Sequence, residues 1–240
     1  MVYKIFPTVL LVVFSLISRN VSFSDTHKVK NVEVARLIKK DNKINEEVVY
    51  NSLNSNHFSL PKLEGFAEAL KGFYLLKEKG LVKKNILTLI DFSLSSNSKR
   101  LWVIDLTTNT ILYNSLVAHG RNTGDEFATS FSNSPQSFKS SLGFYATGEI
   151  YNGKHGKSLK LDGLEKGINS NARERAVVIH GAEYVSNSFI QNNKRLGRSL
   201  GCPAIPLELT NEIIQTIKDK SCLFVYYPSK AYKMASKLVM

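Results

Sequence analysis

Two short segments in the last third of the chain carry the residue types needed for nucleophilic acyl transfer. Residues 176–186 read AVVIHGAEYVS and place His180 at the end of an apolar run. Residues 197–206 read GRSLGCPAIP and place Cys202 in a turn flanked by glycine and proline. A cysteine attacks a carbonyl carbon when a base or cation favours its thiolate and N–H groups hold the developing oxyanion. The two segments therefore predict a cysteine acyltransferase site.

Each requirement of this chemistry has a candidate among these residues. An imidazole titrates near neutral pH, so His180 is the expected base for the thiol. The N–H groups of Gly201 and Cys202 are the expected oxyanion donors, because a residue without a β-carbon permits close approach of a substrate. We therefore predict that Cys202, His180 and Gly201 are the catalytic residues.

Five further residues are predicted to contact substrate. Arg198 can bind a carboxylate through two hydrogen bonds, and the alternative is a surface charge. Ser199 either hydrogen-bonds the substrate or only shapes the turn. His155 lies between two glycines in YNGKHGKSL (151–159) and is either a substrate contact or a residue that fixes its loop. Tyr184 and Gly181, which follow the predicted base, complete the set.

A metal centre is not expected. Histidine precedes glycine at positions 119, 155 and 180, and three such histidines could suggest a zinc site. The chain contains no HExxH pair and no acidic residue suitably placed as a third ligand. We predict neither a metal nor any other cofactor.

The two cysteines allow a disulfide as an alternative to catalysis. An exported chain with two cysteines is first expected to pair them. Cys222, however, begins CLFVYYP, a run of strand-forming residues that is expected to lie inside the fold. A catalytic Cys202 beside a buried Cys222 without a chemical role is therefore the favoured interpretation.

Residues 1–24 have the pattern of a secretory signal peptide. Lys4 precedes an apolar run at 5–18, and Ser22 and Ser24 occupy the small-residue positions before a cleavage site. An uncleaved N-terminal anchor is the alternative, because the run is close to the ~17-residue minimum for a membrane span. We expect an exported protein of the periplasm or cell envelope, with no stable membrane insertion after cleavage.

The charge balance favours an anionic partner. The chain carries a formal net charge of +12, and loss of residues 1–24 with Lys4 and Arg19 leaves +10. No basic segment with interleaved aromatic residues supports binding to nucleic acid. An anionic envelope polymer or membrane surface is the simpler partner, and lysines that only aid solubility are the alternative.

The elements that must position the site divide into a helical part and a strand-rich part. Residues 25–85 are expected to be helical, with a strong amphipathic pattern at 64–80 and a weaker one at 32–40. A late helix fits 207–219, and the tail 229–240 is expected to be frayed. Short strands are predicted at 86–92, 100–106, 110–118, 143–151, 158–164, 175–180 and 222–227. This spacing favours a mainly β sandwich or barrel.

The strand-rich part resembles the murein L,D-transpeptidase catalytic domain family, which is also described as YkuD-like. HGAEYVS at 180–186 and GRSLGCPA at 197–204 carry the resemblance, with VAHGR at 117–121 and HGKSLKLDGL at 155–164 in support. The resemblance covers about 86–228. It implies a catalytic domain built as a β-sandwich with a few peripheral helices, with the cysteine at the head of a groove.

The resemblance implies chemistry on the stem peptides of peptidoglycan. Cys202 would attack the carbonyl of the third stem residue and expel the terminal D-alanine as a thioester forms. An amine from a second stem would resolve the thioester and create a 3–3 cross-link, with His180 moving the protons. Peptidoglycan stem peptides are thus the expected partner.

One departure from the better-known branch of this family leaves the acceptor open. Pro203 and Ala204 follow the cysteine, where that branch has a branched apolar residue and then a basic or amide residue. Water in place of the amine would make the protein an L,D-carboxypeptidase or a cross-link hydrolase. A non-catalytic peptidoglycan-binding protein is a further alternative, and the oligomeric state is left open as well.

Overall fold

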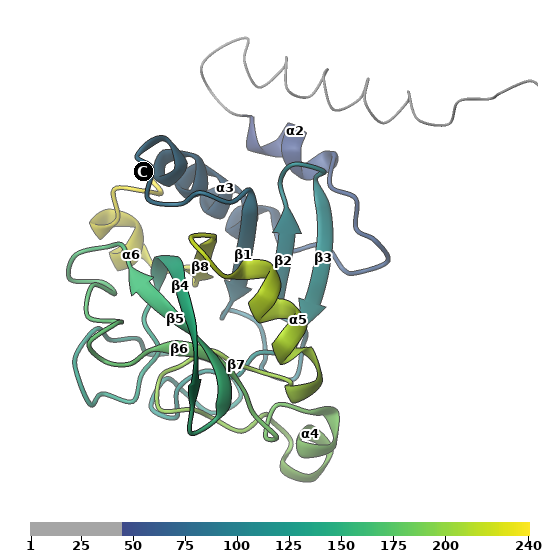
Figure 1. The fold of residues 1–240 in the computed structure, drawn as a ribbon, viewed down its shortest axis with the longest axis vertical. Coiled ribbons are helices and arrows are strands. Elements are labelled where there is room, and N and C mark those ends of the chain that lie inside the picture. Colours follow the sequence, from purple (N-terminus) through teal and green to yellow (C-terminus); the bar gives the residue numbers. More distant parts are fainter. Residues whose placement is uncertain (1–44) are drawn as a thin grey trace, which may run out of the picture.

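The computed structural model of the chain describes residues 45–240. The predicted signal peptide at 1–24 and the weak helix predicted at 32–40 lie outside these residues. Within the described part, one sheet is surrounded by helices and loops (Figure 1). None of the helices in this part is long and apolar enough to cross a membrane.

Eight strands form a single mixed sheet in the order β3-β2-β1-β8-β4-β5-β6-β7. Neighbours are antiparallel except for the pairs β1–β8 and β6–β7. The mainly β fold is therefore confirmed, and each predicted strand has a counterpart in the sheet. The strands are β1 (Ile86–Asp91), β2 (Leu101–Asp105), β3 (Thr110–Ser115), β4 (Gly143–Gly153), β5 (Gly156–Gly163), β6 (Val178–Gly181), β7 (Ala204–Ile205) and β8 (Cys222–Tyr226).

Five helices are described around the sheet in residues 45–240: α2 (Glu46–Asn51), α3 (Leu63–Glu78), α4 (Asn187–Asn193), α5 (Leu207–Ile217) and α6 (Lys230–Ala235). The predicted helices at 64–80 and 207–219 correspond to α3 and α5. Gly80 follows α3 with a φ of 67°, the left-handed conformation that commonly ends a helix. Helix α2 lies within the segment 25–85 that was expected to be helical. Helices α4 and α6 were not predicted, because they have fewer than eight residues each and little periodicity.

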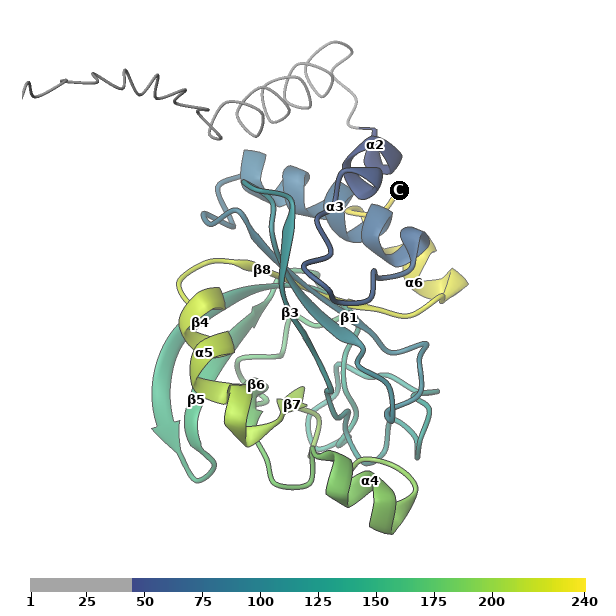
Figure 2. The same ribbon diagram turned by 90° about the vertical axis from the view of Figure 1, so that its right-hand side faces the viewer.

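The core lies between the central strands and the two long helices. All five residues of β8 are buried, and both α3 and α5 contact its neighbour β1 (Figure 2). The apolar stripe of α3 includes Phe66, Leu70 and Phe73, all buried. Gly72 lets this helix approach the sheet, because a β-carbon there would overlap the ring of Phe144. Burial of both helix stripes thus fixes the central strands in place.

The segment that follows the edge strand β3 pairs with β7, the strand at the other edge of the sheet. The N–H of Ala118 donates to the carbonyl of Ala204 in β7 at 2.8 Å, and the N–H of Ala204 returns a bond of 3.3 Å to Ala118. The contact continues where Ser199 N–H donates to His119 O at 3.0 Å and Arg121 N–H donates to Ser199 O at 2.8 Å. The sheet is therefore closed in a barrel-like manner, and the turn that contains the cysteine is attached on both sides.

Arg100 is a buried cation behind this closure. Its Nε and Nη2 donate to Val117 O at 3.2 and 3.0 Å, and its Nη1 donates to Leu94 O at 2.7 Å. Nη2 also lies 2.8 Å from Nδ1 of His119. Burial lowers the pKa of Arg100 to about 9, so the group stays charged at neutral pH. Arg100 thus holds the residues on both sides of Ala118.

The prediction of a frayed tail at 229–240 is wrong. Helix α6 lies in this segment, and the hydroxyl of Tyr232 donates to Oε2 of the buried Glu165 at 3.0 Å. Ser236 Oγ donates to the other oxygen of the same carboxylate at 2.5 Å, and Leu238 is buried. The Lys/Ser-rich composition does not indicate that the tail packs on the fold, because the carboxylate that accepts its hydrogen bonds lies more than 60 residues away in the chain.

Replacement of Arg100 by methionine is expected to lower the free energy of unfolding by ~3–5 kcal/mol, because buried carbonyls lose their donors. Urea titration followed by the fluorescence of Trp102, the single tryptophan, measures the change. Lys99→Met, at an exposed neighbouring position, is the control and should change little. Equal stability of the Arg100 variant and the control would contradict the assigned role.

Candidate active site

Cys202 and His180 line one cleft of about 510 Å³. Its walls come from the β4–β5 hairpin, from β6 with the loop before it, and from the turn 197–202. Of the eight predicted site residues, six line this cleft: Cys202, His180, Arg198, Ser199, His155 and Tyr184. The two glycines, Gly181 and Gly201, lie next to the predicted catalytic pair in sequence but do not line the cleft.

Strand β6 positions His180. Its ring Nδ1 lies 3.0 Å from Gly181 O, and because a carbonyl only accepts, Nδ1 carries the proton and Nε2 keeps a lone pair. Burial lowers the pKa of His180, the hydrogen bond to the Gly181 carbonyl opposes this change, and the nearby His155 and Lys154 lower the pKa further. His180 is therefore a neutral imidazole at neutral pH and has the proton-acceptor form of a base.

The ring of His155 packs on the ring of His180. The centroids are 4.4 Å apart and the planes differ by 19°, which is a stacked arrangement. His155 lies in the turn between β4 and β5, and this turn is brought to β6 by the pairing of Ser158 with His180. The stacked ring shields one face of the predicted base from water.

The thiol of Cys202 contacts the backbone just before β6. The N–H of Val178 lies 3.5 Å from Sγ, and Sγ lies 3.7 Å from the carbonyl of Ala176. Burial raises the pKa of the thiol, while the Val178 N–H and the charges of Arg175 and Lys154 oppose this rise. Within residues 45–240 no hydrogen bond joins Cys202 to His180. The resting pair is a neutral thiol and a neutral imidazole in one cleft.

Ala176 adopts a strained backbone next to the thiol. Its φ is 53°, a left-handed conformation that costs an L-residue about 1–2 kcal/mol. Its carbonyl is the acceptor for the thiol of Cys202. Such strain is frequent at functional sites, where the surrounding structure determines the conformation.

Ser199 organises the turn that carries the cysteine. Its Oγ accepts the N–H of Gly201 at 3.0 Å and donates to Cys202 O at 2.6 Å. Ser140 Oγ donates to Gly201 O at 3.0 Å from the other side. Of the two predicted oxyanion donors, Gly201 thus already uses its N–H, whereas the N–H of Cys202 donates to no other residue of the described part. Ser199 therefore shapes the turn, and its contact with substrate stays a prediction.

Arg198 and Tyr184 hold neighbouring loops at the rim of the cleft. Nη1 of Arg198 donates to Asp125 Oδ1 at 2.5 Å and to Gly124 O at 3.1 Å, so the guanidinium is already paired with a carboxylate. Tyr184 packs on Gly197, where a β-carbon would overlap the tyrosine. Burial raises the pKa of Tyr184 to about 12, which keeps its hydroxyl protonated. Contact of either residue with substrate stays a prediction.

Gly181 is buried below helix α5. A β-carbon at this position would overlap Oγ1 of Thr210, so the glycine allows α5 to pack closely on β6. Its carbonyl fixes the tautomer of His180. Gly181 therefore acts on the base and the helix in this structure, and its predicted contact with substrate stays untested.

Two cations of the cleft were not predicted. Arg175 lies in the loop before β6 and Lys154 lies in the β4–β5 turn, and both line the cleft. Arg175 falls at the start of the strand predicted at 175–180, where a charged residue has no evident role. Its position becomes informative only when the loop is placed beside Cys202.

The other histidine and cysteine that were considered, His119 and Cys222, are buried and do not line the cleft. His119 is buried, and its Nε2 donates to Gly124 O at 3.2 Å while Nδ1 accepts from Arg100. Both cysteines are free, and Cys222 is buried in β8, as predicted, so the disulfide alternative is wrong. Residues 45–240 contain no group of three or more His, Cys, Asp or Glu side chains placed to hold a metal ion.

A family model described as L,D-transpeptidase catalytic domain matches residues 59–226. The match begins before residue 86, where the catalytic domain was expected to start, and therefore includes α3. Comparison with curated proteins gives no match. The matched segment contains every predicted site residue.

Similar solved structures include an L,D-transpeptidase from Mycobacterium smegmatis, with 10% identity over 60% of this chain and 59% of that one, at a TM-score of 0.37. The helical cell shape determining protein Pgp2 from Campylobacter jejuni is 15% identical over 71% of this chain and 62% of its own, at 0.40. An L,D-transpeptidase from Xylanimonas cellulosilytica is 10% identical, over 81% and 93%, at 0.33. The chain thus spans less than two thirds of the first two structures.

Replacement of His155 by alanine is expected to raise the pKa of His180, because water then reaches the stacked face and a neighbour that lowers this pKa is lost. NMR titration of the imidazole Hε1 signals measures this pKa directly. His57→Ala, at an exposed histidine outside the cleft, is the matched control and should leave the titration of His180 unchanged. A lowered or unchanged pKa in His155→Ala would contradict the shielding role.

Proposed function

The chain belongs to the L,D-transpeptidase catalytic domain family, and from this premise we propose that it is a cysteine L,D-transpeptidase of peptidoglycan stem peptides. One observation carries the proposal. The thiol of Cys202 shares a cleft with an imidazole whose Nδ1 is committed to Gly181 O and whose Nε2 keeps its lone pair. That arrangement supports general-base activation of a nucleophile.

The first half-reaction forms a thioester. Sγ of Cys202 attacks the carbonyl carbon of the third stem residue, and the thiol proton passes to Nε2 of His180. The N–H of Cys202 is available to donate to the oxyanion of the tetrahedral intermediate. Collapse of this intermediate breaks the C–N bond, and the leaving D-alanine takes its proton from His180.

The second half-reaction resolves the thioester. An amine of a second stem attacks the same carbonyl carbon while Nε2 of His180 accepts its proton. The C–S bond then breaks, the new amide forms the 3–3 cross-link, and Cys202 is released. Water as acceptor would follow the same path and release a free carboxylate, which is the L,D-carboxypeptidase or hydrolase alternative.

The charges of the cleft suit an anionic peptide. Lys154, His155, Arg175 and Arg198 line it, and no Asp or Glu is among its lining residues. Stem peptides carry carboxylates at their D-alanine end, and cations in a cleft attract such groups. Because peptidoglycan lies outside the cytoplasm, the proposal includes export by the predicted signal peptide and a place in the periplasm or cell envelope.

Cys202→Ala is expected to abolish both the thioester and the dimeric product. The wild-type protein incubated with a tetrapeptide muropeptide should show the acyl-enzyme by intact-mass spectrometry and a 3–3 dimer by chromatography. Cys222→Ala removes the other, buried thiol and should retain activity, which makes it the matched control. Dimer formation by Cys202→Ala would rule out the mechanism, whereas tripeptide monomer without dimer in the wild type would identify a hydrolase.

His180→Ala is expected to slow acylation by about 10²–10⁴-fold, the usual contribution of a positioned acid–base group. Single-turnover formation of the acyl-enzyme isolates this step from product release. His57→Ala again provides the control at an exposed position. An acylation rate within threefold of wild type in a folded His180→Ala protein would remove His180 from the mechanism.

A further inference from the structure

Arg175 is a cation held only by neutral oxygens. Its Nη1 donates to Ser132 O at 2.9 Å and to Ser141 Oγ at 2.6 Å. Its Nη2 donates to Lys139 O at 2.6 Å and to Ser137 Oγ at 3.3 Å. Among residues 45–240 no carboxylate oxygen lies within 4.0 Å of this guanidinium. Four hydrogen bonds thus fix its position while its charge stays without an ionic partner.

The guanidinium lies beside the residue that precedes the nucleophile. A β-carbon at Gly201 would lie 3.4 Å from Nη2 of Arg175 and 3.0 Å from Lys139 O, the carbonyl that accepts from Nη2. Gly201 has a φ of 127°, a conformation that favours glycine. The absence of a side chain therefore lets the cation and its acceptor pack against the turn that carries Cys202.

The other charged and titratable groups around the thiol are less suited to stabilise a thiolate. Arg198 is paired with Asp125, Lys154 is exposed to solvent, which screens its charge, and His155 is exposed as well. Burial of His180 and Tyr184 favours their neutral forms. Arg175 is the half-buried cation of the cleft that is both fixed and free of a carboxylate partner within the described residues.

We propose that Arg175 stabilises the thiolate of Cys202 electrostatically and so prepares the nucleophile for attack; this inference rests on the proposed function, in which Cys202 is the nucleophile. The thiol proton leaves to Nε2 of His180 or to solvent, and the charge that remains on Sγ is balanced by the guanidinium. Arg175 acts through Cys202 and not on substrate, because both of its terminal nitrogens are already held by the chain.

The charge of Arg175 acts on the pKa of the thiol in the direction that this role requires. Burial raises the pKa of Cys202, and the charge of Arg175 opposes that rise. Conversely, burial lowers the pKa of Arg175, and the nearby Tyr145 and then Cys202 oppose the change. The two groups therefore stabilise each other's charged forms.

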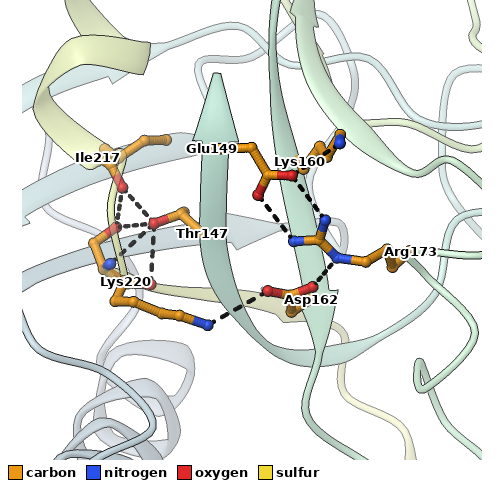
Figure 3. Close-up of polar contacts among 8 residues, drawn as sticks. Thr147, Glu149, Lys160, Asp162, Arg173, Ile217 and Lys220 are labelled. Atoms are coloured by element: carbon orange, nitrogen blue, oxygen red, sulfur yellow. Dashed lines mark hydrogen bonds and ion pairs between the residues drawn. The ribbon is translucent and has the colours of Figure 1, made fainter. Parts of the chain in front are cut away.

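Arg173 offers a natural comparison two positions earlier in the same loop. Its Nη1 and Nη2 donate to Glu149 at 3.0 and 3.2 Å, and its Nε donates to Asp162. Figure 3 shows this guanidinium between the two carboxylates, one from β4 and one from β5. Arg173 is exposed to solvent, which screens its charge, so its loss should change the field at Cys202 much less than the loss of the half-buried Arg175.

Alkylation of the intact, substrate-free protein by iodoacetamide tests the proposal. Sγ forms a bond to the carbon of the reagent and iodide leaves, so the rate follows the thiolate fraction. The pH midpoint for Cys202 is read by peptide mass spectrometry. Arg175→Gln is expected to raise the midpoint by about one unit and slow alkylation about 10-fold at neutral pH. Arg173→Gln should keep the wild-type midpoint, and Arg175→Lys should lie closer to wild type than Arg175→Gln.

A second pair of variants covers the case in which Arg175→Gln does not fold. Ser137→Asp places a carboxylate beside Nη2 while all of Arg175 is kept, and Ser137→Asn is its neutral, isosteric control. The expected result is a higher midpoint for Ser137→Asp than for Ser137→Asn. Thermal unfolding confirms that each compared variant is folded.

Two results would overturn the role of Arg175. One is an equal midpoint in folded Arg175→Gln and wild type, or in both Ser137 variants. The other is an equal rise in Arg175→Gln and Arg173→Gln, which would indicate a general disturbance of the loop. The measurement uses no peptidoglycan, so a failure here is distinct from a failure of muropeptide turnover.

Discussion

The hydrogen-bonded bridge between Ala118 and Ala204 is the constraint on which the site depends. It joins the segment after the edge strand β3 to the opposite edge strand, β7, and so closes the sheet. Cys202 precedes this bridge by two residues, so its position is set by the closure. Arg100 supports the bridge from the interior, and a buried cation is tolerated there because backbone carbonyls satisfy its donors.

Burial in the cleft sets the resting protonation of the site. Removal of water disfavours charge, so the thiol of Cys202 and the imidazole of His180 are both held in neutral forms. A neutral imidazole is the correct form for a base, whereas a neutral thiol is a weak nucleophile. The fold therefore supplies compensating groups close to sulfur: the Val178 N–H and the cation of Arg175.

Much of the fold followed from local patterns. Apolar spacing located α3 and α5, and runs of strand-forming residues located every strand except β7, which has only two residues. The predicted base and nucleophile do lie in one cleft. The tail was misjudged because the acceptor for Tyr232 and Ser236 is Glu165, a residue that no local pattern connects with them.

The sequence by itself determined the elements of the sheet and the chemical types at the site, because periodicity and reactivity are properties of short segments. Only the tertiary structure decided which groups are near sulfur and what each hydrogen bond is used for. Gly201 was expected to offer its N–H to substrate, yet that group donates to Ser199 Oγ. Arg175 had no apparent role until the loop before β6 packed beside the cysteine turn. Such juxtapositions depend on long-range closure of the sheet, which segment patterns do not encode.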